Sequence, residues 1–304
     1  MILKELGWLL LLLVTPAVYS VEFSINLQEP WKPEGKNAYR IEFRRNKETS
    51  RIWIMPKKLE SCSYYRLSFE SADGGLLFAA LIRERLNGRL LHYGYRDDLE
   101  SPGGPKKYSF YFRPKDSNAV FAVYPLQEKE GRCVVRNIRL EKVTDFCRNL
   151  LVEGDFEFGS ALLSRHKRFE KQLAVVESPS FFAGEKSLRL EKKAGDFSAV
   201  ITRDIPAIPG RTAEIRFWAK SQKGMVPCVM YFDFFRGGYK KHLVRRFGFK
   251  AEPEWKEFTF SYAIPSDTAE WPALTEGMAR IQFHLLKSAT EAAVYFDNLE
   301  YRLK

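Results

Sequence analysis

The sequence has little of what metal proteins and most hydrolases display. Its 304 residues include only four histidines and four cysteines, and no two cysteines have the C-x-x-C spacing of a zinc site. A structural zinc site is therefore not expected. A glycine-rich phosphate loop, a serine elbow and an H-E-x-x-H motif are also missing. Their absence disfavours nucleotide-dependent, serine-hydrolase and zinc-protease chemistry.

Long apolar runs are missing beyond the N-terminus. Lys4 precedes an apolar run from Leu6 to Val14, and a polar, small-residue end follows at 15–20. The run is too short to span a hydrocarbon core of about 30 Å, and Val18 and Ser20 suit the −3 and −1 positions of a signal-peptidase site. We therefore predict a signal peptide over 1–20 and a secreted, periplasmic or cell-surface protein with no membrane span after cleavage.

The chain also lacks nucleic-acid-binding motifs, although it is basic. Its net charge is +11, and the basic residues are spread along the chain rather than run together. Removal of the predicted leader takes away Lys4 and Glu5, one charge of each sign, so the net charge stays at +11. In an exported protein this charge fits an acidic glycan or an anionic envelope surface, and it serves solubility equally well. No nucleic-acid partner is expected.

The few cysteines divide into two kinds. Cys228 alternates with Met230 and Phe232, which predicts a buried free thiol on the inner side of a strand. An oxidising compartment permits disulfides, and any two of the other three cysteines could pair. These three are Cys62, Cys133 and Cys147.

Helical periodicity is scarce, and alternating segments separated by Gly, Pro, Asn and Asp dominate. The run 92–105, with its glycines and prolines, is expected to be a long loop. Seven or eight short strands per half, with no helix-length crossover, predict an all-β chain of two tandem antiparallel β-sandwich (jelly-roll) domains. The expected strands are 39–43, 51–55, 63–71, 76–84, 107–114, 119–125 and 133–143, then 186–192, 198–205, 212–221, 227–235, 242–249, 256–264, 279–286 and 293–303.

The two halves correspond to each other along most of their length. Tyr39 aligns with Ser187 and Tyr108 with Phe258, at separations of 148 and 150 residues, and Asn137 aligns with Asn298 at 161. The larger separation comes after the loop around Trp271, which indicates a duplication with one inserted loop. Each copy is long enough to be a domain of its own. The predicted domains are 21–144 and 145–304, with 145–149 as a linker and NLLVEGDFEFG, from residue 149, as the first strand of the second.

The second copy carries five motifs in a fixed order: NLLVEGDFEFG, GEKSLRL, GRTAEIRFWAKS, EWKEFTFSYAIPSDTA and VYFDNLEY. Together they resemble the family 4/9 (CenC-like) carbohydrate-binding modules, which are β-jelly rolls of the galactose-binding-like group, usually attached to exported polysaccharide-degrading enzymes. The resemblance covers 148–304, with a diverged copy in 21–143. It implies polysaccharide binding by a chain with no catalysis of its own, and a protein partner that supplies the catalysis.

The resemblance also implies a structural calcium ion where the first and last strands of the second domain meet. The matching carboxylates are Glu157 of GDFE and Asp297 of FDN, with Asp155 as a further candidate. Carbonyl oxygens of the turn at 184–187 would complete the six to eight oxygen ligands that Ca²⁺ requires. In the first copy Arg136 stands in the position of Asp297, so no calcium is expected there.

The expected glycan-binding residues lie on the outward face of two strands. If Cys228, Met230 and Phe232 point inward, then Tyr231 and Asp233 point outward. The same alternation places three more polar side chains outward, and the resemblance implies that these strands line a concave, glycan-binding face. Trp271, in the inserted loop, would wall the cleft. The predicted ligand-binding residues are Tyr231, Asp233, Trp271, Arg280, Gln282 and His284.

Two other functions remain open. The same outward residues can be an ordinary wet sheet face, with the sandwiches serving as spacers or protein-docking domains of a structural or adhesion protein. A polysaccharide lyase or hydrolase would need a His/Tyr/Arg cluster or two carboxylates across a cleft. The acidic pairs Asp97/Asp98 and Glu252/Glu254 are close in sequence, but adjacent acids in loops are usually solvated. The basic stretch from Tyr239 to Arg246, together with His284, could form a His/Tyr/Arg group. We therefore expect a non-catalytic protein.

Overall fold

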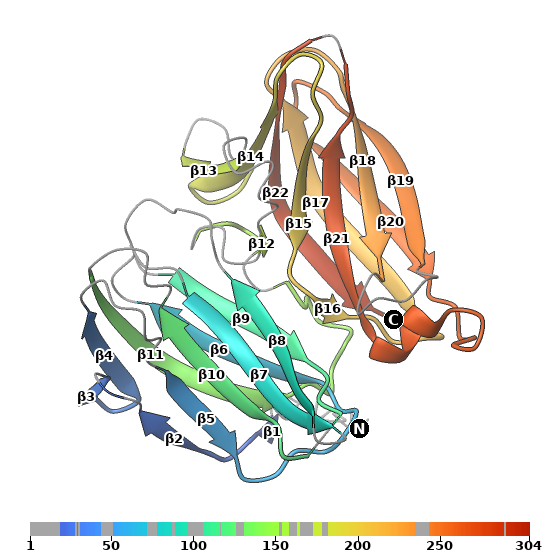
Figure 1. The fold of residues 1–304 in the computed structure, drawn as a ribbon. Helices are drawn as coiled ribbons and strands as arrows, with labels where there is room; N and C mark the ends of the chain where they lie inside the picture. Colours follow the sequence, from blue (N-terminus) through green and yellow to red (C-terminus); the bar gives the residue numbers. More distant parts are fainter. Residues whose placement is uncertain are drawn as a thin grey trace, which may run out of the picture.

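The computed structural model describes most of the chain as two β-sandwiches joined in tandem (Figure 1). The fold class expected from the sequence is confirmed: nearly every described element is a strand, and all strand pairs are antiparallel. The described residues are 19–27, 29, 31–43, 51–71, 78–86, 89–96, 106–115, 117–125, 131–151, 154–157, 163–164, 173–177, 182–234, 243–288 and 290–304.

The first sandwich packs a sheet of order β3-β4-β11-β6-β9, with β1 also paired to β11, against a sheet of order β2-β5-β10-β7-β8. Alternation explains the layers. In β6, every second side chain from Tyr65 to Ser71 is buried. The strands are β1 Tyr19–Ser20, β2 Phe23–Leu27, β3 Lys32–Gly35, β4 Ala38–Phe43, β5 Ile52–Pro56, β6 Tyr65–Ser71, β7 Phe78–Leu86, β8 Arg89–Arg96, β9 Lys106–Phe112, β10 Val120–Pro125 and β11 Gly131–Lys142.

The second sandwich repeats this layout. One sheet has the order β13-β14-β22-β17-β20, and the other has the order β12-β15-β21-β18-β19, with β16 also paired to β21. The strands are β12 Leu163–Ser164, β13 Leu173–Glu177, β14 Lys186–Lys192, β15 Ser198–Thr202, β16 Ile205–Pro206, β17 Thr212–Ser221, β18 Val226–Asp233, β19 Val244–Ala251, β20 Lys256–Ala263, β21 Met278–Leu285 and β22 Ala292–Leu303, with a short 3-10 helix, η2, at Pro272–Glu276.

An irregularity recurs at the same place in both sandwiches. The pairing of β11 with β6 shifts register between Arg136 and Arg139, and that of β22 with β17 shifts opposite Arg216 and Trp218. Asn137 has φ 56° and Asn298 has φ 48°. Asparagine tolerates this left-handed conformation better than most residues, which explains its presence at each β-bulge.

Two sequence expectations about local structure are wrong. The described part of NLLVEGDFEFG is not a strand, because Gly154 N–H bonds to the carbonyl oxygen of Leu151 and Phe156 adopts φ 59°, which together make a turn. Residues 92–96, expected within a long loop, belong to strand β8 and pair with β7. The alternation of polar and apolar residues in this stretch is too imperfect to signal a strand.

Each sandwich has its own aromatic-rich core. In the second, the fully buried ring of Phe217 lies within 4.8–6.1 Å, between centroids, of five other rings. These neighbours are Phe249, Phe258, Phe260, Phe283 and Phe296. Because they come from strands of both sheets, this cluster joins the two layers of the second sandwich.

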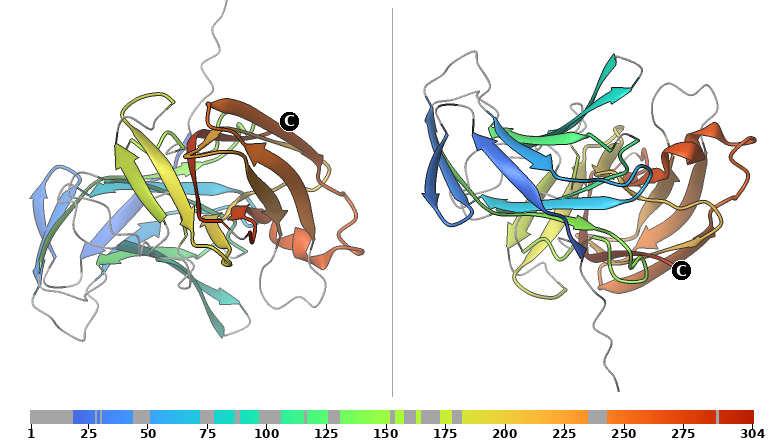
Figure 2. Two further views of the ribbon diagram at one scale, coloured as in Figure 1. Left: turned by 90° about the horizontal axis from the view of Figure 1, so that it is seen from above. Right: turned by 90° about the horizontal axis from the view of Figure 1, so that it is seen from below.

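The two sandwiches lie against each other, as both views in Figure 2 show. Tyr64 and Tyr111 of the first sandwich belong to the buried cluster of the second. The Tyr64 hydroxyl donates to the carbonyl oxygen of Gly277 at 2.9 Å, and Arg113 Nη1 donates to that of Thr275 at 2.5 Å. The Tyr64 bond is buried and the Arg113 bond is exposed. Because side chains of the first sandwich complete the buried cluster of the second, the chain is best treated as one unit in solution experiments.

The linker between the sandwiches lies against the second one. Leu150 N–H bonds to Tyr301 O and Leu303 N–H to Phe146 O, so the linker runs beside the last strand.

Cys228 is a buried free thiol, as predicted, and burial raises its pKa to about 12. Cys62 and Cys147 are exposed free thiols, whereas the side chain of Cys133 lies outside the described residues. Of the signal peptide predicted over 1–20, residues 1–18 also lie outside them, and Tyr19 and Ser20 form β1, which pairs with β11. Within the described ranges, no helix is long and apolar enough to cross a membrane.

Candidate functional site

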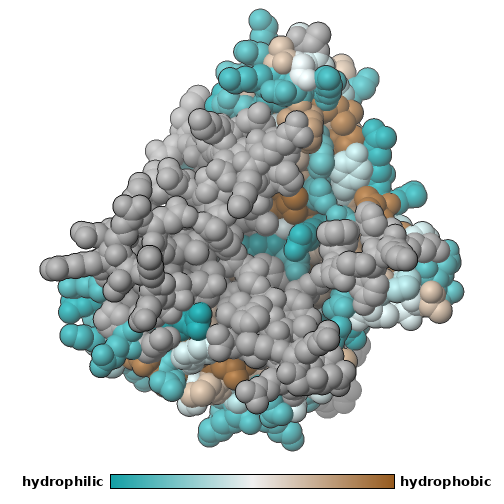
Figure 3. Space-filling model, in the orientation of Figure 1, coloured by the Kyte–Doolittle hydropathy of each residue, from teal (hydrophilic) through white to brown (hydrophobic). Residues whose placement is uncertain are grey.

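The face predicted for ligand binding lies on strands β15, β21, β18 and β19. Cys228, Met230 and Phe232 are buried against the core, which leaves Tyr231 and Asp233 on the opposite side, partly exposed. Arg280, Gln282 and His284 alternate in the same way on β21. Figure 3 shows polar and apolar residues mixed on the coloured part of the surface around β18 and β19. We call the outward side of these four strands the polar–aromatic face.

Strand register brings the predicted residues into contact. Tyr231 lies opposite Gln282, and Asp233 lies opposite Arg280. Gln282 Nε2 donates to Asp233 Oδ2 at 2.7 Å, and the Gln282 amide oxygen lies 3.1 Å from His284 Nε2. Because an amide oxygen only accepts, the proton of this bond is on Nε2 of the imidazole. The polar side chains are thus ordered as a chain rather than free to rotate.

Aromatic rings flank this polar chain. The Tyr231 ring meets the His284 ring edge-on, with centroids 4.8 Å apart. Phe197, just before β15, lies nearly parallel to the His284 ring, at 6.5 Å between centroids. Phe197 was missed by the sequence argument because it precedes its strand. Its only sequence signal is an aromatic residue directly after a Gly-Asp turn.

A second missed residue is Asp204, next to β16. Its carboxylate accepts from Arg280 Nε at 2.5 Å, and its side chain is 4% exposed. This buried carboxylate positions the Arg280 guanidinium at the end of the polar–aromatic face. The alternation of β21 places Arg280 outward, but nothing in the sequence pairs it with Asp204.

Trp271 lies in a different setting from the other predicted residues. It precedes helix η2 and packs, partly buried, against the core of the second sandwich. The loop that carries it touches the first sandwich, where Lys115 Nζ lies 2.8 Å from Glu276 Oε1 and Arg113 binds Thr275. The inserted loop therefore holds the two domains together. A contact between Trp271 and ligand stays a prediction.

The predicted calcium ligands converge at the turn over 182–186. Asp297 Oδ2 accepts from the N–H groups of Phe182 and Ala183 at 2.8 and 3.1 Å. Glu157 Oε1 accepts from the N–H groups of Glu185 and Lys186 at 2.8 and 3.0 Å. Gly184 lies so close to Glu157 that a Cβ there would overlap the carboxylate. The turn thus folds over both carboxylates.

Two carboxyl groups lie close together at this turn. The Asp297 side chain is fully buried, and its pKa is raised mainly by burial and further by the negative charge of Glu157, against three backbone N–H bonds that lower it. Two close carboxylates fit the oxygen preference of Ca²⁺. In the described ranges no third acidic, His or Cys side chain joins them, Asp155 included. The Asp155 carboxylate instead accepts from Glu157 N–H at 3.3 Å.

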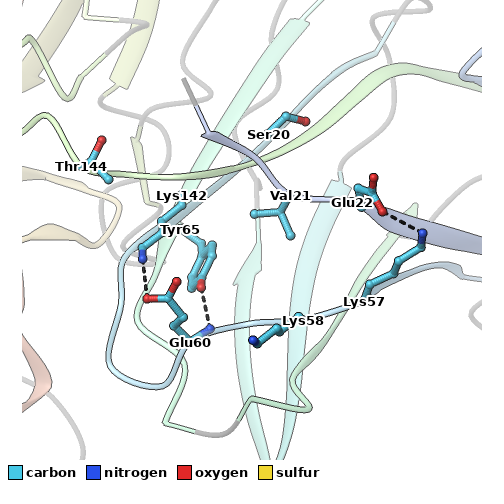
Figure 4. A pocket seen from close by; sticks show the side chains of 9 residues that line it. All are labelled: Ser20, Val21, Glu22, Lys57, Lys58, Glu60, Tyr65, Lys142 and Thr144. Atoms are coloured by element: carbon cyan, nitrogen blue, oxygen red, sulfur yellow. Dashed lines mark hydrogen bonds and ion pairs between the residues drawn. The ribbon is translucent and has the colours of Figure 1, made fainter. Parts of the chain in front are cut away.

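A separate cavity of about 570 Å³ lies in the first sandwich (Figure 4). Its two acidic side chains are both held by lysines: Glu22 lies 2.7 Å from Lys57 Nζ, and Glu60 is bound to Lys142. These lysines lower the pKa of both carboxyl groups through a hydrogen bond and charge. Both carboxylates of this cavity are therefore engaged by lysines. It is lined by Ser20, Val21, Glu22, Lys57, Lys58, Glu60, Tyr65, Lys142 and Thr144.

Carbohydrate-binding modules are among the solved structures to which the chain is similar. No protein-family profile and no curated protein match it. The N-terminal CBM22-1–CBM22-2 tandem domain of Xyn10C from Paenibacillus barcinonensis aligns at a TM-score of 0.41 and 11% identity, over 95% of this chain and 97% of that one.

Two further structures align with about half of the chain. A CBM4 structure has a TM-score of 0.36 and 14% identity, over 51% of this chain and 99% of that one. The arabinose-bound MgGH51 α-L-arabinofuranosidase has a TM-score of 0.41 and 10% identity, over 52% of this chain and 27% of that one.

Proposed function

We propose that the chain is a non-catalytic carbohydrate-binding protein that holds a polysaccharide on the polar–aromatic face of its second sandwich. One observation carries the proposal: Tyr231 and Phe197 flank a row of polar side chains in which Asp233, Gln282 and His284 are already linked by hydrogen bonds. Sugars present C–H faces and hydroxyl groups together. Aromatic side chains beside preordered polar groups match both.

The finer assignment follows the motif resemblance. We propose a module of the family 4/9 type, exported after cleavage of 1–20 and acting beside a protein that supplies catalysis. The first sandwich has the same strand order as the second. If it also binds, two weak sites on one chain would gain avidity on a repeating polymer.

The chemistry of the described residues supports binding rather than catalysis. On the polar–aromatic face, Asp233 accepts from Gln282 and Asp204 accepts from Arg280. Both carboxylates are thus occupied by donors within the protein. Tyr239 and His242 of the alternative catalytic cluster lie outside the described residues.

The test is isothermal titration of the full chain with a panel of neutral and acidic oligosaccharides. We expect saturable heat with at least one glycan and a loss of at least tenfold in affinity in Tyr231→Ala, because a central stacking ring contributes about 1.4 kcal/mol or more. The full chain is used because Tyr64 and Tyr111 complete the core of the second sandwich.

A blocking variant makes the test independent of Tyr231. Gly248 lies opposite Val229 on the outward side of β19, and a Cβ there meets nothing within 4 Å. Gly248→Leu should therefore fold normally but project into the bound glycan and abolish binding. Gly35→Leu is the matched control, since a Cβ there is also unobstructed and Gly35 lies in β3 of the first sandwich. Undiminished binding in both Gly248→Leu and Tyr231→Ala would refute this face as the site, and no heat with any glycan would favour a spacer or adhesion role.

Calcium at Glu157 and Asp297 is part of the same proposal. The bound ion would neutralise the two carboxylates and fix the turn over them. A free Ca²⁺ concentration of about 100 times the dissociation constant adds roughly 2.7 kcal/mol to the free energy of unfolding. For a domain of this size this raises Tm by about 5–10 °C. We expect this increase on adding Ca²⁺ and its reversal by a chelator.

The pH dependence and variants make the calcium prediction specific. A raised pKa of Asp297 means that its proton stabilises the folded state at low pH and is lost as the pH rises through that pKa. Protons therefore compete with calcium, and the calcium-dependent increase in Tm should shrink on acidification. Glu157→Gln and Asp297→Asn should abolish it, and Asp155→Asn should retain it. An equal calcium response in all three variants would show that the ion binds elsewhere.

A further inference from the structure

The outer strand of the polar–aromatic face carries two exposed cations. Arg246 lies opposite Tyr231, and Lys250 lies opposite Pro227. Both are exposed, and both are on the same side of β19 as Gly248, because alternate residues of a strand share a face. In the part of the chain that the structure describes, neither side chain makes a hydrogen bond or an ion pair.

The cations of this face outnumber its acidic groups. Asp204 is bound to Arg280 within the second sandwich, and the Asp233 carboxylate, which accepts from the neutral amide of Gln282, counts as one negative charge against the two cations. Arg246 and Lys250 are four residues apart, about 13 Å along an extended strand. The face therefore has an aromatic and amide centre with two positive side chains along one border, separated by the open surface over Gly248.

We infer that this border selects an anionic polysaccharide, with Arg246 and Lys250 binding carboxylate or sulfate groups of a chain whose sugar rings lie against Tyr231. The inference rests on the proposed function and adds the class of ligand. A guanidinium beside an aromatic ring suits a sugar that carries an anion, since the ring holds the apolar face and the guanidinium binds two oxygens at once. The net charge of +11 would steer such a polymer toward the protein.

The experiment compares three ligands of matched length on the full chain: oligogalacturonate for carboxylate, a sulfated galactan oligosaccharide for sulfate, and a neutral oligosaccharide. Binding is measured at about 0.05 and 0.5 M salt, where screening lengths differ severalfold. We expect an anionic ligand to bind best and to weaken with salt. Arg246→Gln with Lys250→Gln should lose about tenfold in affinity for it, as two exposed ion pairs would, and leave neutral-ligand binding unchanged.

A matched control separates a local site from overall charge. Lys32→Gln with Lys36→Gln also removes two charges, at exposed positions of the first sandwich, and should leave affinity unchanged. Equal losses in both double variants would attribute the attraction to net charge and overturn the inference. Preference for the neutral ligand, with no effect of Arg246→Gln and Lys250→Gln, would overturn it while leaving the proposed function intact. If no glycan bound, both the inference and the proposed function would be overturned.

Discussion

Replacing Phe217 by alanine should lower the free energy of unfolding of the second sandwich by about 3–5 kcal/mol, as large aromatic deletions in cores do. The Phe217 side chain is fully buried. Its ring centroid lies 4.8 Å from that of Phe283 and 6.0 Å from that of Phe296, and three further rings on β19 and β20 surround it. Because the neighbours belong to both sheets, they cannot close the cavity without moving the sheets together. Urea unfolding followed by far-UV circular dichroism measures the effect.

The adjacent residue is the control for Phe217→Ala. Trp218 is larger but points to the other side of β17, where Phe182 stacks on it with centroids 3.7 Å apart. It is only partly buried, so Trp218→Ala should cost clearly less than Phe217→Ala. Equal costs for the two variants would contradict the assignment of inner and outer faces on β17.

Replacing Gly154 by alanine should be similarly severe, at about 3 kcal/mol or more, because it removes a close backbone approach. A Cβ at this position would overlap the carbonyl oxygen of Leu299. The two backbones are also joined by the bond from Leu299 N–H to Gly154 O, at 2.9 Å. Backbone atoms cannot rotate away as a flexible side chain can, so the turn must separate from β22.

This second variant also has a functional consequence. The turn that begins at Gly154 carries Glu157, and β22 carries Asp297, so separating them should weaken calcium binding along with stability. Gly248→Ala is the control, because a Cβ there meets nothing within 4 Å, and it should unfold like the parent protein. Thermal unfolding with and without calcium measures both effects. A Gly154→Ala protein as stable as Gly248→Ala would show that the close approach to Leu299 is not required.

Much of the fold follows from alternation. In the stretch from Cys228 to Asp233, residues of even number are apolar and are buried, whereas Tyr231 and Asp233 are partly exposed. A strand offers only two faces, so a period of two residues is sufficient to assign each side chain to the core or to the outside. The same rule placed Arg280, Gln282 and His284. The alternation rule failed for the described residues of 149–157, because a turn shaped by Gly154 and Phe156 has no alternation of inward and outward side chains.

The sequence by itself determined the fold class and the inward and outward residues of the main strands, and its resemblance to the family 4/9 modules implied that Glu157 and Asp297 are neighbours. Only the tertiary structure decided which outward residues meet. Phe197 joins His284, Asp204 joins Arg280, and Arg246 lies opposite Tyr231. These partners are 87, 76 and 15 residues apart, and strand order and register set them. Local periodicity assigns a face but contains no information about which strand lies alongside, so the neighbours on that face arise only when the sheet assembles.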